Sequence, residues 1–220
     1  MLKNIKLKFE RLYSLHNRKG FKNLLKIITN HIFEQLIAIG YIYKVELSNL
    51  NYIPENKNFE FRIINEFDLN IMQINYREEF NEKIYSDFLS KLNMPTVDGF
   101  ILKKGNDICG YFFLAYGKSE SEVEKQYFNV KKNGYLFNDY VFKKHRGEKI
   151  QQYGIYKRLM LLNEKKYKTA TCIIEHDNIQ SIKSYEKFGF QRYLVKLHFR
   201  FGNYIRSREI IKPYKKKFNS

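Results

Sequence analysis

The chain has 220 residues and a formal net charge of +17, and hydrophobic residues make up 44% of it. This length is enough for one packed domain, with or without an appendage. The charge favours an anionic partner, such as nucleic acid, an acidic lipid surface or a phosphorylated ligand. A coding bias towards Lys, Asn, Ile, Tyr and Phe would explain the same excess without any partner.

The two cysteines, Cys109 and Cys172, lie in apolar, strand-like segments. A disulfide scaffold needs more cysteines in a shorter chain, so we expect free buried thiols and a cytoplasmic protein. The histidines are scattered without the ligand spacing of a zinc site, and we expect no metal. No apolar run reaches the ~18–20 residues that a membrane-spanning helix requires, and no secretory signal is evident.

Residues 1–40 are rich in lysine and arginine, and residues 21–39 carry apolar side chains at three- and four-residue spacing. This pattern predicts an amphipathic helix that packs on the main domain or on a second subunit. The alternative is a basic anchor on an anionic membrane surface, which would make the protein peripheral at the inner membrane. We predict a helical appendage and linker over 1–55, within which residues 41–47 are extended, a main domain over 56–211 and a basic tail over 212–220.

The main domain is predicted to mix strands and helices. Patterns along it predict a strand at 59–64, helices over 66–92 with a break near Asn75, strands at 100–102 and 108–116 joined by a hairpin, a charged loop or short helix at 117–132, a strand at 135–142, a helix, a strand at 169–175, a helix at 178–189, and a last hairpin at 193–211. This order indicates an α+β (α/β layered) domain with a largely antiparallel sheet and one parallel crossover.

The segment 141–190 carries the candidate site. A strand runs into a sharp turn, and a helix follows the turn. Unpaired N–H groups and the helix dipole at such a helix start can hold a phosphate. We expect this phosphate site to be formed by Arg146, Gly147, Glu148, Lys149, Ile150 and Gln151. The later helix starts at Asn178, and its spacing places Ser181 and Tyr185 close to one face with it.

This stretch resembles the GNAT superfamily of acetyl-CoA-dependent N-acetyltransferases. The family's Asn, small residue, Tyr and Gly-Phe are matched by Asn178, Ser181, Tyr185, Gly189 and Phe190. The family's phosphate turn is usually Gln/Arg-x-x-Gly-x-Gly/Ala, and Lys149 and Gln151 stand here at its two small positions. An alternative alignment supplies the missing glycine with Gly154, but it requires an insertion and a shortened helix.

The resemblance implies a GNAT-like mixed, mostly antiparallel sheet with helices on both faces. In that fold two central strands splay apart, and the pantetheine of acetyl-CoA enters the gap. The resemblance also implies that Val141 and Phe142 pair with pantetheine through their backbone, that Asn178 and Ser181 lie at the cofactor, and that Tyr185 lies near the sulfur. A phenol is protonated at neutral pH, so Tyr185 could give its proton to the departing thiolate as general acid.

The residue that takes the proton of the attacking amine is less evident from the sequence. Asp139, on the strand before the turn, is the first choice, and Glu175, at the end of the next strand, is the second. His145 and His176 lie at turns and are further options. Neither cysteine has a setting that would activate a thiol, and no Ser-His-Asp pattern is present, so we expect direct transfer in a ternary complex.

The expected acceptor is a primary amine on a small molecule. The basic N-terminal segment resembles those of bacterial GNAT proteins connected with cell-surface glycans, which favours an amino sugar or a sugar-nucleotide intermediate. Peptide amines and polyamines stay open, although a cationic polyamine suits a protein of charge +17 less well. Two alternatives are a non-catalytic GNAT-like module that binds nucleic acid or anionic membrane, and aminoacyl transfer from charged tRNA.

Overall fold

The computed structural model describes residues 37–50, 58–116, 120–123, 126–129, 133–201 and 204–210. Contacts divide the chain into a larger unit, which contains Tyr41–Leu194, and a smaller one, which contains Val195–Ile211 and the chain up to Gly40. The predicted helix at 21–39 and the basic tail lie outside the described residues, except that residues 37–39 are strand. No helix among the described residues is long and apolar enough to span a membrane.

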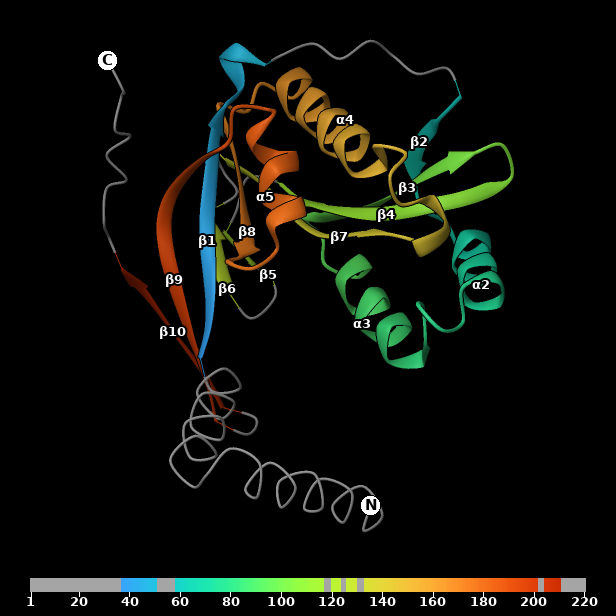
Figure 1. Cartoon of the computed structure of the whole chain (residues 1–220), viewed down its shortest axis with the longest axis horizontal. Helices are drawn as coiled ribbons and strands as arrows, with labels where there is room; N and C mark the ends of the chain where they lie inside the picture. Colours follow the sequence, from blue (N-terminus) through green and yellow to red (C-terminus); the bar gives the residue numbers. More distant parts are fainter. Residues whose placement is uncertain are drawn as a thin grey trace, which may run out of the picture. The chain divides into compact units, whose positions relative to one another are not determined.

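The larger unit is built on a mixed sheet in which the strand order is β1-β8-β7-β4-β3-β2 (Figure 1). These strands are β1 (Ile37–Glu46), β2 (Glu60–Ile63), β3 (Val97–Lys104), β4 (Asp107–Ala115), β7 (Asn133–Val141) and β8 (Thr169–Glu175). From β2 to β7 the neighbours pair antiparallel, and β7 pairs parallel with β8. The predicted α+β class with one parallel crossover is confirmed.

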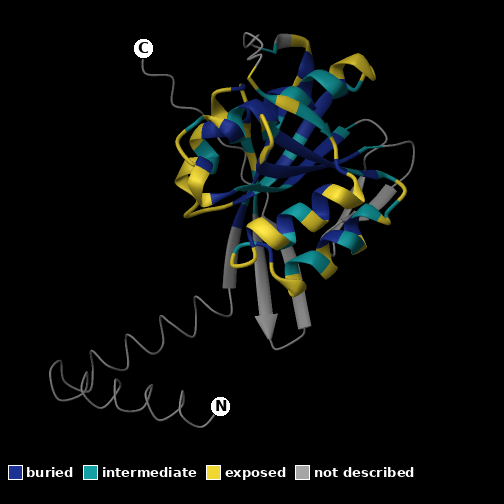
Figure 2. Cartoon of the chain, turned by 90° about the vertical axis from the view of Figure 1, so that its right-hand side faces the viewer, coloured by how far each residue is buried: buried dark blue, intermediate teal, exposed yellow. Residues whose placement is uncertain are grey.

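Helices cover both faces of this sheet (Figure 1). One face carries α2 (Glu66–Asn75) and α3 (Glu82–Leu92), and the other carries α4 (Ile150–Glu164) and α5 (Ile179–Glu186). Strand β4 joins the two cores, because Phe112 and Leu114 face α4 while Phe113 and Ala115 face α2 and α3. The central strands are accordingly buried, and exposed residues lie on the outer sides of the helices and in the loops (Figure 2).

Two segments differ from the sequence prediction. Residues 117–132, predicted to form a charged loop or short helix, contain the antiparallel strands β5 (Glu120–Val123) and β6 (Gln126–Asn129). Residues 37–39, predicted to end a helix, instead begin β1, which continues through the predicted extended segment at 41–46 and lies beside β8 in the sheet. Short strands rich in charge look like loops in a sequence, and an apolar run that continues a helical pattern hides a strand start.

In the smaller unit, the end of β9 (Gln191–Phe201) pairs antiparallel with β10 (Tyr204–Ile210). The pairing runs from Tyr204 opposite Phe201 to Ile210 opposite Val195. This pairing confirms the predicted last hairpin, whose two turn residues lie outside the described residues.

The two parallel strands separate partway along their length. The pairing of β7 with β8 ends at Leu136 opposite Cys172, although β7 continues to Val141 and β8 to Glu175. Just beyond, β7 bulges against β4: Phe113 lies opposite Phe137, but Tyr111 lies opposite Tyr140. Two residues of β7 therefore face one residue of β4, and Asn138 adopts a positive φ of 51°. The splay and the bulge together open the sheet at the carboxyl end of β7.

Candidate active site

The turn after β7 leads into α4 through the short 3₁₀ helix η2 (Lys143–His145). Gly147 has a φ of 89°, and Lys149, the N-cap residue of α4, has a φ of 61° and makes no side-chain cap. The first N–H groups of an α-helix have no intrahelical acceptor, and lysine has no oxygen with which to accept from them. The start of this 15-residue helix therefore presents free donors and the positive end of its dipole.

A cavity of about 710 Å³ opens onto this helix start, between the end of β7, the turn and α5. It is lined by nine of the predicted site residues: Asp139, Val141, Arg146, Gly147, Lys149, Ile150, Gln151, Asn178 and Ser181. Arg146, Lys149, Lys183 and Lys187 give its lining four cationic side chains, against the single carboxylate of Asp139. Cations together with helix-start donors suit a phosphate-bearing ligand.

Hydrogen bonds tie α5 to α4 at this cavity. Asn178 caps α5, since its Oδ1 accepts from the Ser181 N–H at 3.1 Å. Gln151 Nε2, in the first turn of α4, donates to Ser181 Oγ at 2.9 Å. The side chain at the second of the two small positions is thus held towards α5. Gly154, the glycine of the alternative alignment, lies in mid-helix, where an added Cβ would meet the Phe112 ring at 2.6 Å. The ungapped alignment fits the structure.

His145 supplies independent evidence for a ligand in this cavity. Its side chain is buried and lines the cavity, and its Nε2 has no hydrogen-bond partner among the described residues. The other ring nitrogen lies 3.3 Å from Glu148 Oε1. Buried polar atoms are normally paired, so the unpaired nitrogen points to a group supplied from outside the chain.

Glu148 does not oppose an anion in the cavity. Its Oε2 accepts from Lys104 Nζ at 2.5 Å, and the carboxylate does not line the cavity. The hydrogen bond from Lys104, followed by that from His145, lowers the pKa of Glu148 below its ordinary value. The acid of the turn is therefore neutralised by a lysine of β3 rather than presented to the ligand.

A buried polar cluster lies at the base of the cavity, where β7 bulges. Tyr185 donates from its hydroxyl to Asp139 Oδ2 at 2.8 Å, and Arg158 Nη2 donates to the same oxygen at 2.8 Å. Tyr185 is 3% exposed and Arg158 is fully buried. Burial, with the nearby charge of Asp139, raises the pKa of Tyr185 well above 10, so the phenol stays protonated.

Four predicted residues do not line the cavity: Phe142, Glu148, Glu175 and Tyr185. Phe142 is fully buried, its ring stacks on Tyr76, and its N–H donates to the Cys109 carbonyl at 3.0 Å. That N–H is therefore not free to pair with pantetheine, contrary to our expectation. Glu175, the last residue of β8, and His176, which follows it, are both exposed. Tyr185 reaches the cavity only through its bond to Asp139.

Sequence reasoning missed Arg158 and the two lysines of α5. Lys183 and Lys187 are four residues apart, with Gln180 and Ser184 on the same helix face, and all four line the cavity. Arg158 lies three residues after Ile155 and shortly before Leu159 and Leu162, and these three apolar residues are buried. An arginine inside an apolar helical stripe is the signal that could have revealed it, since a buried cation needs a partner.

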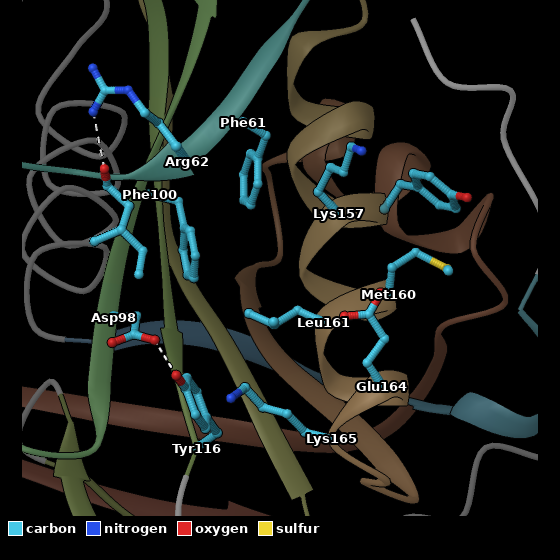
Figure 3. A pocket seen from close by; sticks show the side chains of 12 residues that line it. Phe61, Arg62, Asp98, Phe100, Tyr116, Lys157, Met160, Leu161, Glu164 and Lys165 are labelled. Atoms are coloured by element: carbon cyan, nitrogen blue, oxygen red, sulfur yellow. Dashed lines mark hydrogen bonds between the residues drawn. The ribbon is translucent and has the colours of Figure 1, made fainter.

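A second cavity, of about 550 Å³, lies between the β2–β3 edge and the second half of α4 (Figure 3). Its walls are largely apolar, with Phe61 stacked on Phe100 at 4.9 Å and Leu161 facing them from α4. The polar groups that Figure 3 joins by dashed lines already bond within the protein: Tyr116 donates to Asp98, and Arg62 donates to a backbone carbonyl. The first cavity is therefore the better candidate for the active site.

No protein-family model matches the sequence, and no curated protein matches it. Solved structures do match. A conserved protein of unknown function from Staphylococcus epidermidis is 12% identical with a TM-score of 0.56, over 89% of this chain and 77% of that one. A GCN5-related glucosamine N-acetyltransferase region of a fungal multi-domain β-N-acetylglucosaminidase is 9% identical with a TM-score of 0.53, over 79% of this chain and 22% of that one.

The chain has the GNAT fold. A Drosophila protein also shares it, at 11% identity and a TM-score of 0.52, and this chain spans 56% of that protein's length. At such identities the likeness establishes the fold alone. The GNAT fold agrees with the splayed strands and with a cavity at the start of α4, and it is the fold that the resemblance of the segment 141–190 implies.

Proposed function

We propose that this protein is an acetyl-CoA-dependent N-acetyltransferase, which moves the acetyl group to a primary amine in a ternary complex. The observation that carries the proposal is the cationic cavity at the uncapped start of α4, beside the point where β7 and β8 separate. The unpaired His145 Nε2 inside that cavity supports it. A phosphate-bearing substrate with a long thin arm suits both features, because its phosphates would meet the helix start and its arm the gap.

The diphosphate of acetyl-CoA would bind the N–H groups of the first turn of α4, with Arg146 and Lys149 beside it. Arg146 is held there because its Nε donates to the Val141 carbonyl at 3.2 Å. Pantetheine would run along the end of β7 past Asp139 and Val141. Asn178 and Ser181 would shape the opposite wall, from α5. Phe142 is left out of this assignment, because its N–H is already bonded.

In the chemical step the amine nitrogen attacks the acetyl carbonyl carbon, a C–N bond forms and the C–S bond breaks. The nitrogen loses a proton to Asp139, and the leaving thiolate receives the phenolic proton of Tyr185, whose hydroxyl would turn from Asp139 towards the sulfur. Asp139 then returns a proton to Tyr185 across their 2.8 Å hydrogen bond, which restores both groups. Glu175, the exposed last residue of β8, is the second candidate for the base.

Direct transfer is favoured over a cysteinyl intermediate. Burial raises the pKa of Cys109 to about 11, and it raises the pKa of Cys172 well above the ordinary value. A thiol acts as a nucleophile through its thiolate, so both sulfurs are chemically inert near neutral pH.

For the acceptor we propose an amino sugar or a sugar-nucleotide intermediate. The GNAT-fold region of the fungal protein is described as a glucosamine N-acetyltransferase, which supports an amino-sugar acceptor by analogy of fold. No feature of the described residues favours transfer from tRNA or a nucleic-acid module. The segment on which a membrane anchor would depend, residues 1–36, lies outside the described residues.

Acetyl-CoA titration by calorimetry tests the proposal, with two matched glycine variants. Gly147 and Gly105 both have positive φ, 89° and 59°, and an added Cβ at either would meet nothing within 4 Å. Alanine at either position therefore carries backbone strain alone, about 1–2 kcal/mol. We expect micromolar binding by the wild type. In Gly147→Ala the strained turn would relax to another backbone conformation, and binding would have to restore the original one, so the Kd should rise roughly 5–30-fold. Gly105→Ala should bind normally. Wild-type protein that binds no acetyl-CoA would refute the proposal.

A further inference from the structure

Arg158 is a fully buried cation in the middle of α4, and it makes contacts to three separate parts of the fold. Its Nε donates to the Gly154 carbonyl at 3.0 Å, its Nη1 to the Phe113 carbonyl of β4 at 2.7 Å, and its Nη2 to Asp139 Oδ2 of β7 at 2.8 Å. The guanidinium therefore spans both strands at the bulge. A compact ammonium could not hold the same set of acceptors with one fixed geometry.

Stability alone does not require this ion pair. Apolar residues of similar volume often replace a buried ion pair without loss, because the desolvation of two charges offsets their attraction. Arg158 lies among the apolar residues Ile155, Leu159 and Leu162, where another apolar side chain would pack as well. The buried charge of Arg158 is thus better explained by the groups that it positions than by a gain in folding stability.

The two oxygens of Asp139 have different surroundings. Oδ2 accepts both from Tyr185 and from Arg158, each at 2.8 Å. Oδ1 lies 2.7 Å from Arg158 Nη1 as an ion pair, but it has no partner of hydrogen-bond geometry among the described residues. Asp139 lines the cavity at the bulge. The guanidinium therefore holds both oxygens of Asp139, and Oδ1 is itself buried.

We propose that Arg158 is a positioning residue for acyl transfer: it holds the Asp139 carboxylate and the β7 bulge in the geometry in which the carboxylate takes the proton of the acceptor amine. The inference rests on the proposed acetyltransferase function. Arg158 touches neither substrate, so it acts only through Asp139 and the bulge. In this arrangement the amine proton passes to the Asp139 carboxylate, and Tyr185 stays bonded to Oδ2 until the thiolate leaves.

The test is a double-mutant cycle of Arg158→Lys and Asp139→Asn, with acetyl-CoA and glucosamine as probes and release of the CoA thiol as the signal. Arg158→Lys should lower kcat by about 10–100-fold, the scale of a misplaced general base, and leave the Kd for acetyl-CoA within about twofold. In the Asp139→Asn background the same change should cost less than about twofold in kcat, because the residue acts through Asp139. Independent, multiplicative effects in the cycle would overturn the proposal.

Leu159→Ala is the matched control, since Leu159 is equally buried on the same helix. It should lower the melting temperature and leave kcat unchanged well below that temperature; an equal loss of kcat would mark the Arg158 effect as merely structural. Arg158→Gln serves as a second variant should Arg158→Lys fail to fold, with the same expected cycle.

A measurement without substrate separates this inference from the proposed function. Backbone hydrogen exchange in the ligand-free protein should speed up locally, at residues 138–140, in Arg158→Lys and not in Leu159→Ala. Unchanged exchange at the bulge would overturn the positioning role. Wild-type protein that shows this local pattern but binds no acetyl-CoA would refute the proposed function, and would keep Arg158 as the residue that sets the bulge.

Discussion

Reversing the charge at the start of α4 should separate affinity from stability. Lys149 is exposed, lines the cavity and occupies the N-cap of α4, where it cannot accept from the free N–H groups. Lys149→Asp places a negative charge at the positive end of the helix dipole, which stabilises a helix by about 0.3–1 kcal/mol. Aspartate also tolerates the left-handed backbone of this position, whose φ is 61°. The variant should therefore unfold at the same temperature as the wild type or slightly higher.

The same change should weaken the binding of acetyl-CoA. At ~6 Å in water-like surroundings, one unit charge is worth about 0.7 kcal/mol to a phosphate charge, so a reversal costs about 1.4 kcal/mol. That energy corresponds to roughly a tenfold rise in Kd for each phosphate charge at that distance. Calorimetric titration and thermal unfolding of one preparation give both quantities.

Lys165→Asp is the matched control, because Lys165 ends the same helix and is also exposed. The 15-residue helix separates the two positions by about 22 Å, beyond the Debye length of ~8 Å at physiological salt. The control should lose stability, since it puts an anion at the negative end of the dipole, and should keep the wild-type Kd. Equal loss of affinity in both variants, or no loss with Lys149→Asp, would refute a phosphate site at the start of α4.

Three further predictions concern the rate of catalysis, the affinity for acetyl-CoA and the pH dependence of stability. Tyr185→Phe should lower kcat by about 10²–10⁴-fold, the usual contribution of a general acid, with the KM for acetyl-CoA little changed; turnover at the wild-type rate would remove Tyr185 from the mechanism. The Kd for acetyl-CoA should rise steadily between low and physiological salt, which titrations at several salt concentrations would show, whereas a salt-independent Kd would contradict a cationic cavity. Because the pKa of Cys109 is raised from 9.0 to about 11 on folding, its contribution to stability is present below pH 9 and is lost as the pH rises towards 11. The wild type should accordingly lose more stability than Cys109→Ala in unfolding curves between pH 8 and pH 11.

The local elements were predictable from the sequence because short-range chemistry fixes them. Asn178 caps α5 as its side chain and position suggest, and the break predicted near Asn75 is the end of α2. Gly105 has the positive φ that the hairpin between β3 and β4 requires. In each case the residues that decide the structure are within a few positions of one another.

The pairing of distant segments was not predictable in the same way. Nothing in residues 37–46 says that they pair beside β8, because the alternation that marks 41–47 as extended does not identify a partner strand. The bulge in β7 was not predicted either, although the adjacent polar residues Asn138 and Asp139 interrupt the strand pattern and asparagine tolerates a positive φ. Phe142 shows the consequence: one register shift against β4 decides whether its N–H is free or bonded to Cys109.

The position of Lys149 in the structure changes the role that the sequence suggests for it. By resemblance, lysine replaces a small residue of the phosphate turn and narrows it. The backbone at Lys149 nevertheless adopts the left-handed conformation for which a glycine would be chosen, at a cost of about 1–2 kcal/mol. A serine or aspartate N-cap would satisfy the helix start from within, whereas lysine leaves those donors to a ligand and adds a positive charge beside them. An unfavourable cap for the helix is thus a favourable residue for an anion, and the departure from the family pattern is compatible with phosphate binding.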